Sequence, residues 1–236
     1  MKIIVLTDVH ANLPALQAAL QAIRREGYDA LFHLGDAIAI GPQPAECLAL
    51  LRALPDAHFI MGNHDAYFAR GLPARMAAGE LAHQQWTHAQ LDPSLRSEIA
   101  QWPYYLSMTF AGWRTYFAHY ALDASGQNWL PIVKQPAAAD LDVLFTPIDA
   151  DLIFYGHHHP FADVVGRARY INPGSLGCGD TAVARFTVVD FQSSGYHVQH
   201  RAVAYDDAPL AAAFKARQVP ERAFLNKIFF GGRLGL

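Results

Sequence analysis

Side chains that can bind metals follow three short apolar runs in the first half of this chain. Asp8 and His10 come directly after the run KIIVLT, and Asp36 comes after ALFHLG. Asn63 and His64 follow a third run, HFIMG. A strand that leaves a protein core needs only a turn residue at that point. Carboxylate, imidazole and amide groups in this pattern instead favour the binding of divalent cations.

The second half of the chain repeats the pattern with imidazoles alone. His119 follows the run RTYFA, and His157 and His159 follow DLIFYG. Ligands of an open α/β sheet bind beyond the carboxyl ends of its strands, so five strands would deliver these groups to one pocket. The set mixes nitrogen and oxygen and has no thiolate, which suits first-row metals such as manganese, iron or zinc. Four histidines and two aspartates exceed what one ion needs, so we expect two ions that share a carboxylate.

The elements that must position these groups alternate between strands and helices. Apolar runs of strand length occupy residues 2–7, 30–35 and 58–62. A helical pattern begins after Asn12, which we expect to be its N-cap, and a second one covers residues 44–54. This alternation predicts an α/β protein with a parallel core.

Later elements are more varied. The region 66–101 is Ala-rich and mostly helical, and residues 104–119 resemble a hairpin around Ala111–Gly112. Three prolines interrupt residues 120–150. Further strands are predicted at 151–156, 168–172, 182–191 and 196–205, followed by two short helices. We therefore expect two packed sheets with outer helices, and we expect residues 66–101 and 120–150 to shape substrate specificity.

Composition limits the class of protein. The 236 residues are 52% hydrophobic and 17% charged, so a single domain over residues 1–236 with a sizeable core is expected. The net charge of −3 includes no basic stripe, which argues against a partner that is a membrane or a polymeric nucleic acid. No apolar stretch has the length of a membrane helix or a signal peptide. Cys47 and Cys178, far apart and outside any zinc-like spacing, indicate reduced thiols in a cytoplasmic protein.

The order of the polar motifs resembles a known family. The motifs DVH at 8–10, GD at 35–36, GNHD at 62–65, a strand-end histidine and GHHH at 156–159 are similar to those of the calcineurin-like metallophosphoesterase superfamily. INPGS at 171–175 and a closing AYDD segment resemble its YfcE-like branch of small bacterial and archaeal phosphodiesterases. The resemblance covers essentially the whole chain and implies a four-layer α/β/β/α sandwich.

The resemblance also implies a role for each site residue. One metal would be held by Asp8, His10, Asp36 and His159, and a second by Asp36, Asn63, His119 and His157. Asp36 would bridge the two ions, of which manganese is the first expectation and iron, zinc or nickel the alternatives. A hydroxide shared by the ions would attack phosphorus, while His64, as an imidazolium, would donate a proton to the leaving group.

Two departures from the family pattern bear on specificity. Tyr120 stands where the family usually has a glycine after the strand-end histidine. The GD segment continues as AIAIGP and lacks the Asp-Arg pair of protein Ser/Thr phosphatases, which disfavours a phosphoprotein substrate. The expected substrate is a small phosphodiester, phosphomonoester or nucleotide. The substrate-binding residues and a homo-oligomer are left open.

Alternatives remain at the level of the whole chain and of single residues. A non-catalytic metal-binding scaffold or interaction protein of the same fold is one rival, because the retromer scaffold subunit keeps this fold without evident catalysis. A dinuclear hydrolase of another bond, such as an amide, is a second rival. The presence of His64 and of the GNHD and GHHH motifs favours a phosphoesterase. Asp65 would either orient His64 or cap the following helix. His33 is expected to pack in the core or on a sheet face, and His83 is expected to be a surface or packing residue.

Overall fold

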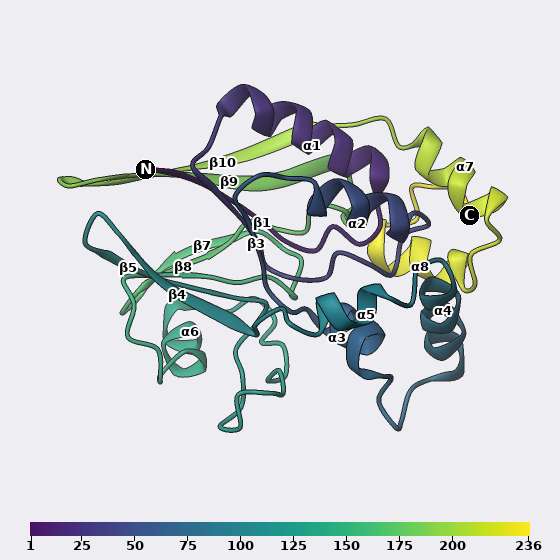
Figure 1. Ribbon diagram of the computed structural model, residues 1–236, viewed down its shortest axis with the longest axis horizontal. Coiled ribbons are helices and arrows are strands. Elements are labelled where there is room, and N and C mark those ends of the chain that lie inside the picture. The colour runs from purple at the N-terminus through teal and green to yellow at the C-terminus, as the bar shows by residue number, and fades with distance from the viewer.

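Two five-stranded sheets form the centre of the computed structural model, which describes residues 1–236 (Figure 1). The first sheet contains, in order, β10 (Gly195–Ala204), β9 (Val183–Gln192), β1 (Lys2–Leu6), β2 (Ala30–His33) and β3 (Ala57–Phe59). The second sheet contains β4 (Tyr105–Phe110), β5 (Trp113–Ala118), β6 (Leu152–Phe154), β8 (Arg169–Asn172) and β7 (Ala162–Val165). Each sheet is mixed, with three parallel strands, β1–β2–β3 or β5–β6–β8, beside antiparallel ones.

Eight helices surround the two sheets. They are α1 (Leu13–Glu26), α2 (Pro44–Arg52), α3 (Asn63–Arg70), α4 (Ala78–Ala89), α5 (Leu95–Ile99), α6 (Ala138–Leu144), α7 (Ala208–Ala216) and α8 (Arg222–Phe229). In Figure 1, α1 and α2 lie on the side of the first sheet and α6 on the side of the second, while α3, α4 and α8 gather at one end. None of these helices has the length and apolar character required to cross a membrane.

The alternation of side chains along β1 explains the layered core. Ile3 and Val5 point between the sheets and belong to a buried cluster with Phe117 of the second sheet. Ile4 belongs to a separate buried cluster with Leu16 of α1, on the other face. Successive strand residues point to opposite faces, so a strand covered on both sides is apolar throughout. The run KIIVLT was predicted as such a strand, and that prediction is confirmed.

The second sheet is covered on its outer face by α6. Leu141 and Phe145, from α6 and the residue after it, pack with Tyr116, Ile153 and Tyr170 of the sheet. The resulting order of layers is helix, sheet, sheet, helix. The predicted four-layer α/β/β/α sandwich is therefore confirmed.

Local signals fixed the start and the end of α1. The side chain of Asn12 accepts a hydrogen bond from the backbone N–H of Ala15 at 3.1 Å, and Gly27 ends the helix at a φ of 65°. This is the N-cap that the sequence predicted. The side-chain amide of Asn12 also donates to the carbonyl oxygen of Gly177, so the cap ties α1 to a distant loop.

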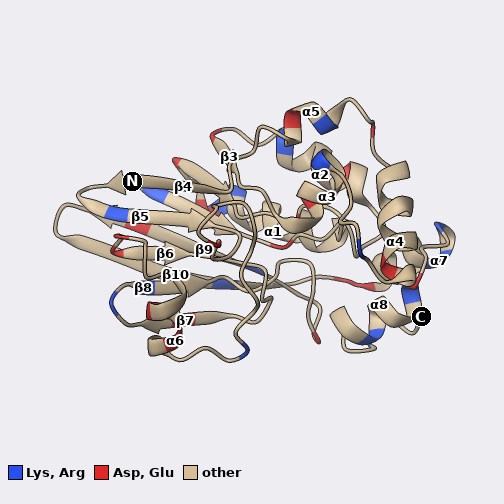
Figure 2. Cartoon of the chain, turned by 90° about the horizontal axis from the view of Figure 1, so that it is seen from below, with Lys and Arg blue, Asp and Glu red and all other residues tan.

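Two elements were missed. Strand β7 is a four-residue edge strand that follows the histidine-rich turn, and its pattern is too short to stand out. Helix α6 lies in the proline-containing region, where the sequence showed no clear element. Charged side chains of both signs are spread over the whole chain, as Figure 2 shows.

Candidate metal centre

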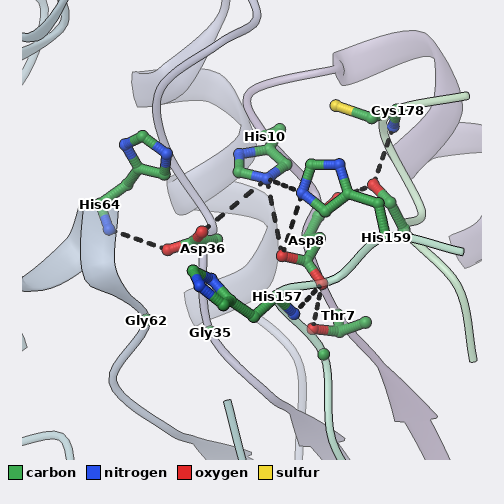
Figure 3. Close-up of polar contacts among 12 residues, drawn as sticks. Thr7, Asp8, His10, Gly35, Asp36, Gly62, His64, His157, His159 and Cys178 are labelled. Carbon is green, nitrogen blue, oxygen red and sulfur yellow. Dashed lines mark hydrogen bonds and ion pairs between the residues drawn. The ribbon is translucent and has the colours of Figure 1, made fainter. Parts of the chain in front are cut away.

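The eight predicted site residues converge where parallel strands of both sheets end. Asp8 and His10 follow β1, Asp36 follows β2, Asn63 and His64 begin α3 after β3, His119 follows β5, and His157 and His159 follow β6. Figure 3 shows most of these side chains turned toward one another from loops of both sheets. The sequence therefore predicted the residues that meet here, while their individual roles stay predictions.

Asp8 has one satisfied and one free carboxylate oxygen. Its Oδ2 accepts hydrogen bonds from the Thr7 hydroxyl at 2.7 Å and from the backbone N–H of His157 at 3.0 Å. Its Oδ1 is buried without a hydrogen-bond partner. The nearest ring nitrogens, Nε2 of His10 and of His159, lie 3.6 and 3.5 Å from it. A buried anionic oxygen without a donor is costly, and a bound cation would remove that cost.

The charge of Asp8 is favoured by its surroundings. Burial opposes ionisation, but the nearby imidazoles of His10 and His159 outweigh it and hold the pKa of the carboxyl group well below its ordinary value. The carboxylate is therefore negatively charged at neutral pH, as a metal ligand must be.

Asp36 lies between two groups of imidazoles. Its Oδ1 accepts a hydrogen bond from the backbone N–H of His64 at 2.9 Å, at the N-terminus of α3, where a negative charge is stabilised. Its Oδ2 is 3.8 Å from Nε2 of His10 and 3.3 Å from Nε2 of His119. Burial opposes ionisation here too, but the charge of His119 lowers the pKa of Asp36. This is the position that a bridging carboxylate requires.

His119 presents one nitrogen to the site and uses the other for support. Its Nδ1 lies 2.9 Å from the carbonyl oxygen of Leu34 and donates to it, which leaves a lone pair on Nε2. That Nε2 is 3.1 Å from Nδ1 of His157 and 3.2 Å from Oδ1 of Asn63. Metal-binding histidines commonly donate their second ring nitrogen in this way. Burial opposes protonation, but the charge of Asp36 raises the pKa of His119 to about 9, so a bound cation would have to displace the proton from Nε2.

Tyr120 does not displace His119, although the family usually has a glycine there. Its ring is buried in the core on the outer face of the second sheet. Its hydroxyl accepts a hydrogen bond from the backbone N–H of Val133 at 3.0 Å. The departure from the family pattern is therefore accommodated by core packing beside the site, where the centroid of the Tyr120 ring lies 5.4 Å from that of His157.

A second pair of imidazoles meets on the other side of Asp36. Nε2 of His10 and Nε2 of His159 are 2.9 Å apart, and Nδ1 of His10 lies 3.4 Å from the carbonyl oxygen of Ile38. The thiol of Cys178 belongs to the same cluster, within 4.8 Å of both nitrogens. Burial raises the pKa of this thiol, so it is protonated. Cys178 belongs to no sequence motif, and only its place three residues after the INPGS segment links it to the site.

The donor set fits two divalent cations that share Asp36. Two clusters of ligand atoms have this carboxylate in common, one with His10 and His64 and the other with His119 and His157. Nitrogen and carboxylate oxygen are suitable ligands for first-row metals. The first cluster contains His64, so geometry alone allows this residue to be a ligand or a proton donor.

The turns that carry the ligands are conformationally unusual. Asp8, His10, Asp36, His157 and His159 have φ values of 52°, 48°, 57°, 64° and 70°. Residues other than glycine rarely adopt this left-handed region, and each such residue costs about 1–3 kcal/mol. Strain of this kind concentrates at functional sites. A local turn signal alone would not predict it.

Two glycines allow the ligand loops to approach closely. A Cβ on Gly62 would lie 2.2 Å from the backbone nitrogen of Asp36, within the first sheet's loops. A Cβ on Gly156 would lie 2.0 Å from Oγ1 of Thr7, between the two sheets. No side chain fits at either position. The glycine of the GNHD motif therefore lets two loops of the first sheet approach each other, and the glycine of the GHHH motif lets the edges of the two sheets come together.

Asp65 positions the Asp36 turn. Its Oδ2 accepts hydrogen bonds from the backbone N–H groups of Asp36 at 2.7 Å and of Gly62 at 3.1 Å, and its Oδ1 accepts one from Ala37 at 3.1 Å. Of the two roles left open, capping of α3 is the one observed, and no hydrogen bond joins Asp65 to the His64 ring. Burial, with the nearby charge of Asp36, raises the pKa of Asp65 to about 7.

His64 is held by a residue that the sequence did not indicate. Nε2 of Gln84, on α4, lies 2.6 Å from Nδ1 of His64 and donates to it, so the neutral ring carries its proton on Nε2. Gln84 is buried and lies outside every motif. Burial disfavours the charged ring and lowers the pKa of His64 to about 3. Without metal or substrate, His64 is thus a neutral imidazole, and the imidazolium expected during the reaction stays a prediction.

Two other histidines pack in the core, as predicted for His33, whereas for His83 the sequence did not decide between surface and packing. His33 is buried in β2, and its Nδ1 accepts a hydrogen bond from the backbone N–H of Gly35 at 3.2 Å. His83 is buried on α4, and its Nε2 accepts one from the backbone N–H of Ile40 at 2.8 Å.

Two cavities adjoin the site. One, of about 510 Å³, includes His64 in its wall, and the other, of about 620 Å³, includes His159. A third cavity, of about 560 Å³, lies between the β4–β5 hairpin and the region of α6, and none of the predicted site residues lines it.

Comparison with known proteins establishes the family. The family model of the calcineurin-like phosphoesterase superfamily domain matches residues 1–194, so this chain belongs to that superfamily. The chain is 27% identical to an uncharacterized protein, MJ0912, of Methanocaldococcus jannaschii, in an alignment of 250 positions that covers 98% of each chain. The superfamily predicted from the motifs is confirmed.

Solved structures share the fold. The hypothetical protein PH1004 from Pyrococcus horikoshii superposes with a TM-score of 0.80 at 20% identity, over 98% of each chain. A metallophosphoesterase from Sphaerobacter thermophilus superposes with a TM-score of 0.71 at 24% identity, over 100% of this chain and 98% of that one.

Proposed function

We propose that this chain is a metal-dependent phosphoesterase that hydrolyses a small phosphodiester, phosphomonoester or nucleotide. The observation that carries the proposal is the shared carboxylate of Asp36, which lies between two groups of imidazoles. The partnerless Oδ1 of Asp8 adds a buried negative charge to the same place. Membership of the calcineurin-like phosphoesterase superfamily supports a phosphoester substrate.

Two divalent cations, with manganese as the first candidate and iron, zinc or nickel as alternatives, fit these residues. One would be held by Asp8, His10, Asp36 and His159, and the other by Asp36, Asn63, His119 and His157. When bound, the ions would supply Lewis acidity toward the phosphoryl group and acidify water. The chain would present ring nitrogens of fixed tautomer to the ions. His119, for example, donates its Nδ1 proton to the Leu34 carbonyl oxygen, which directs Nε2 toward the site.

His64 would donate the proton to the leaving oxygen. In the absence of substrate its ring is neutral, with Nδ1 facing the amide of Gln84. A bound phosphoester is an anion, and a nearby negative charge favours the protonated imidazole. His64 would therefore take up a proton as the substrate binds and deliver it when the ester bond breaks.

The surface supports a small substrate. Lys and Arg positions are interspersed with Asp and Glu positions along the ribbon (Figure 2), and the net charge is −3. A polymeric nucleic acid or a membrane as partner is disfavoured on this ground. Two free cysteines support a reducing, cytoplasmic location, and a homo-oligomer remains open.

The test is a panel of phosphomonoesters, cyclic and linear phosphodiesters, dinucleoside polyphosphates and one phosphopeptide. Each is assayed with Mn²⁺ and with a chelator, for the wild type and for Asp8→Asn. We expect hydrolysis of at least one small ester with Mn²⁺, loss with chelator, and loss in the variant. Failure to hydrolyse any compound while two metal ions remain bound would favour the scaffold alternative. A phosphopeptide hydrolysed better than every small ester would contradict the proposed substrate class.

A further inference from the structure

The cavity beside His64 lies between α4 and α8. These helices neighbour each other in both Figure 1 and Figure 2. Asn63, His64 and Gln84 contribute to its wall, so the cavity begins at the predicted proton donor. Its volume of about 510 Å³ is within the range of small-molecule sites.

One wall of this cavity is an exposed apolar face of α8. Phe224 and Ile228 are 56% and 54% exposed, although both are large apolar side chains. They are four residues apart and therefore lie on the same face of the helix. Both line the cavity, together with Phe229. Apolar side chains on a concave wall next to a reactive group are typical of a ligand site.

The helix that carries this wall is held firmly. Leu225 and Phe230 are buried in a cluster with Leu210 and Phe214 of α7. The exposed face with Phe224 therefore belongs to a helix whose other face is packed against α7. Helices α7 and α8 lie beyond residue 194, where the superfamily match ends.

The charged groups that line the cavity are carboxylates. Glu80 of α4 and Glu221, just before α8, belong to its wall, which includes no Lys or Arg. Glu221 lies across the start of α4, because a Cβ on Gly79 would be 2.8 Å from its Cδ. By contrast, the cavity beside His159 includes Arg185. An anionic group would therefore be repelled on the His64 side.

We propose that this cavity binds the leaving group of the substrate and selects an uncharged apolar or aromatic group over an anionic one. The inference rests on the proposed phosphoesterase activity and on His64 as the donor to the leaving oxygen. The expected substrate is then a phosphoester whose leaving alcohol is an aromatic or nucleoside-like body without its own phosphate. A dinucleoside polyphosphate, whose leaving group is itself an anionic nucleotide, is a poor fit.

The kinetic test uses two esters that differ in the leaving group. 2-Naphthyl phosphate and 4-carboxyphenyl phosphate release phenols of similar acidity, but only the second phenol carries a negative charge. The wild type should hydrolyse the naphthyl ester with the higher kcat/KM. Phe224→Ala should raise the KM for the naphthyl ester about tenfold, as expected for the loss of a large buried apolar contact. Val143→Ala, which removes an exposed apolar side chain on α6, is the matched control and should leave KM and kcat/KM unchanged for both esters.

Charge selectivity is tested separately with Glu80→Gln. This substitution should raise kcat/KM for the carboxyphenyl ester by several-fold and leave the naphthyl ester almost unchanged. Equal effects on both esters would contradict the proposed role of the carboxylates.

A binding measurement separates this inference from the proposed function. 2-Naphthol is titrated into the chelator-treated protein and followed by its fluorescence. Binding that Phe224→Ala weakens about tenfold, while Val143→Ala does not, supports the aromatic site even if no ester is hydrolysed. Hydrolysis and naphthol binding that are both insensitive to Phe224→Ala would overturn the inference and leave the phosphoesterase intact. A change of oligomeric state in Phe224→Ala would instead identify this face as an interface between copies, which also overturns it.

Discussion

The edges of the two sheets bring different chemistry to the same site. Loops that follow β1 and β2 of the first sheet supply both carboxylates, Asp8 and Asp36. Loops that follow β5 and β6 of the second sheet supply imidazoles alone, from His119, His157 and His159. The negative charge that attracts cations therefore comes from one sheet, and the second sheet completes the coordination. Substitutions on the two edges should therefore differ in their effects on metal binding and activity.

The largest effect is expected at the shared carboxylate. Asp36→Asn keeps the shape of the side chain but removes its charge, so both proposed metal positions lose a ligand. We expect the activity to fall to background, beyond the roughly 10–100-fold that groups supporting metal ligands typically contribute. Metal content, measured by elemental analysis, should fall with it. Asp163→Asn, at a half-buried position in an ion pair outside the site, is the control. Normal metal content in Asp36→Asn would contradict the bridging role.

His64 is the one predicted site residue of the first sheet that the proposal does not make a ligand. His64→Ala should lose about 10²–10⁴ in kcat on esters with poor leaving groups, and less on a nitrophenyl ester, which needs little protonation. Metal content should be unchanged. Gln84→Met should show the same selectivity with a smaller loss, because it removes only the support of the ring. Equal losses on both esters, with loss of metal, would identify His64 as a ligand instead.

An imidazole of the second sheet should matter less than a carboxylate of the first. His159→Ala should weaken the affinity for Mn²⁺ and lower hydrolysis of good and poor esters together, and excess Mn²⁺ should restore much of the activity. Cys178→Ser is the matched variant, because its thiol is close to the same nitrogens but protonated. It should retain near-normal metal affinity. If Cys178→Ser loses more metal than His159→Ala, the assignment of ligands on this side is wrong.

The smallest effect is expected in the pH dependence of the free energy of unfolding, through His33 in β2 of the first sheet. Burial lowers the pKa of His33 to about 3, from an ordinary value of 6.5. Between these values the unfolded chain binds a proton that the folded chain does not, so the free energy of unfolding falls as the pH drops below 6.5. The slope from one such group is at most about 1.4 kcal/mol per pH unit.

Urea unfolding of the metal-free protein at several pH values measures this slope. His33→Gln should flatten it between pH 6.5 and 5, whereas His197→Gln, at an exposed position on β10, should not. Equal slopes in the two variants would show that His33 does not contribute.

The first sheet was also easier to predict than the second. Its strands β1 and β2 are continuous apolar runs, and Asn12 and Gly27 mark the ends of α1. In the second sheet, β7 is a short edge strand with Asp163 in its middle, so it shows no clear hydrophobic pattern. Local signals are weak where pairing with a distant strand decides the structure.

The site itself was predictable only in part. The residue types at the strand ends indicated which groups would meet. Gln84 was missed because it reaches His64 from a helix of ordinary composition, twenty residues along the chain. Cys178 and Phe224 were missed because their places depend on how distant loops and helices pack. Sequence patterns reveal ligands that follow strands, whereas supporting and specificity residues emerge only from tertiary structure.

The number of metal ions bound per chain tests the proposed two-metal centre most directly. The purified wild-type chain is loaded with Mn²⁺, freed of excess metal and analysed for manganese per chain, alongside hydrolysis of the best ester from the panel. We predict two ions per chain, loss of activity on chelation, and recovery of activity when Mn²⁺ is added again. A folded chain that hydrolyses the ester at its full rate without bound metal would contradict this prediction.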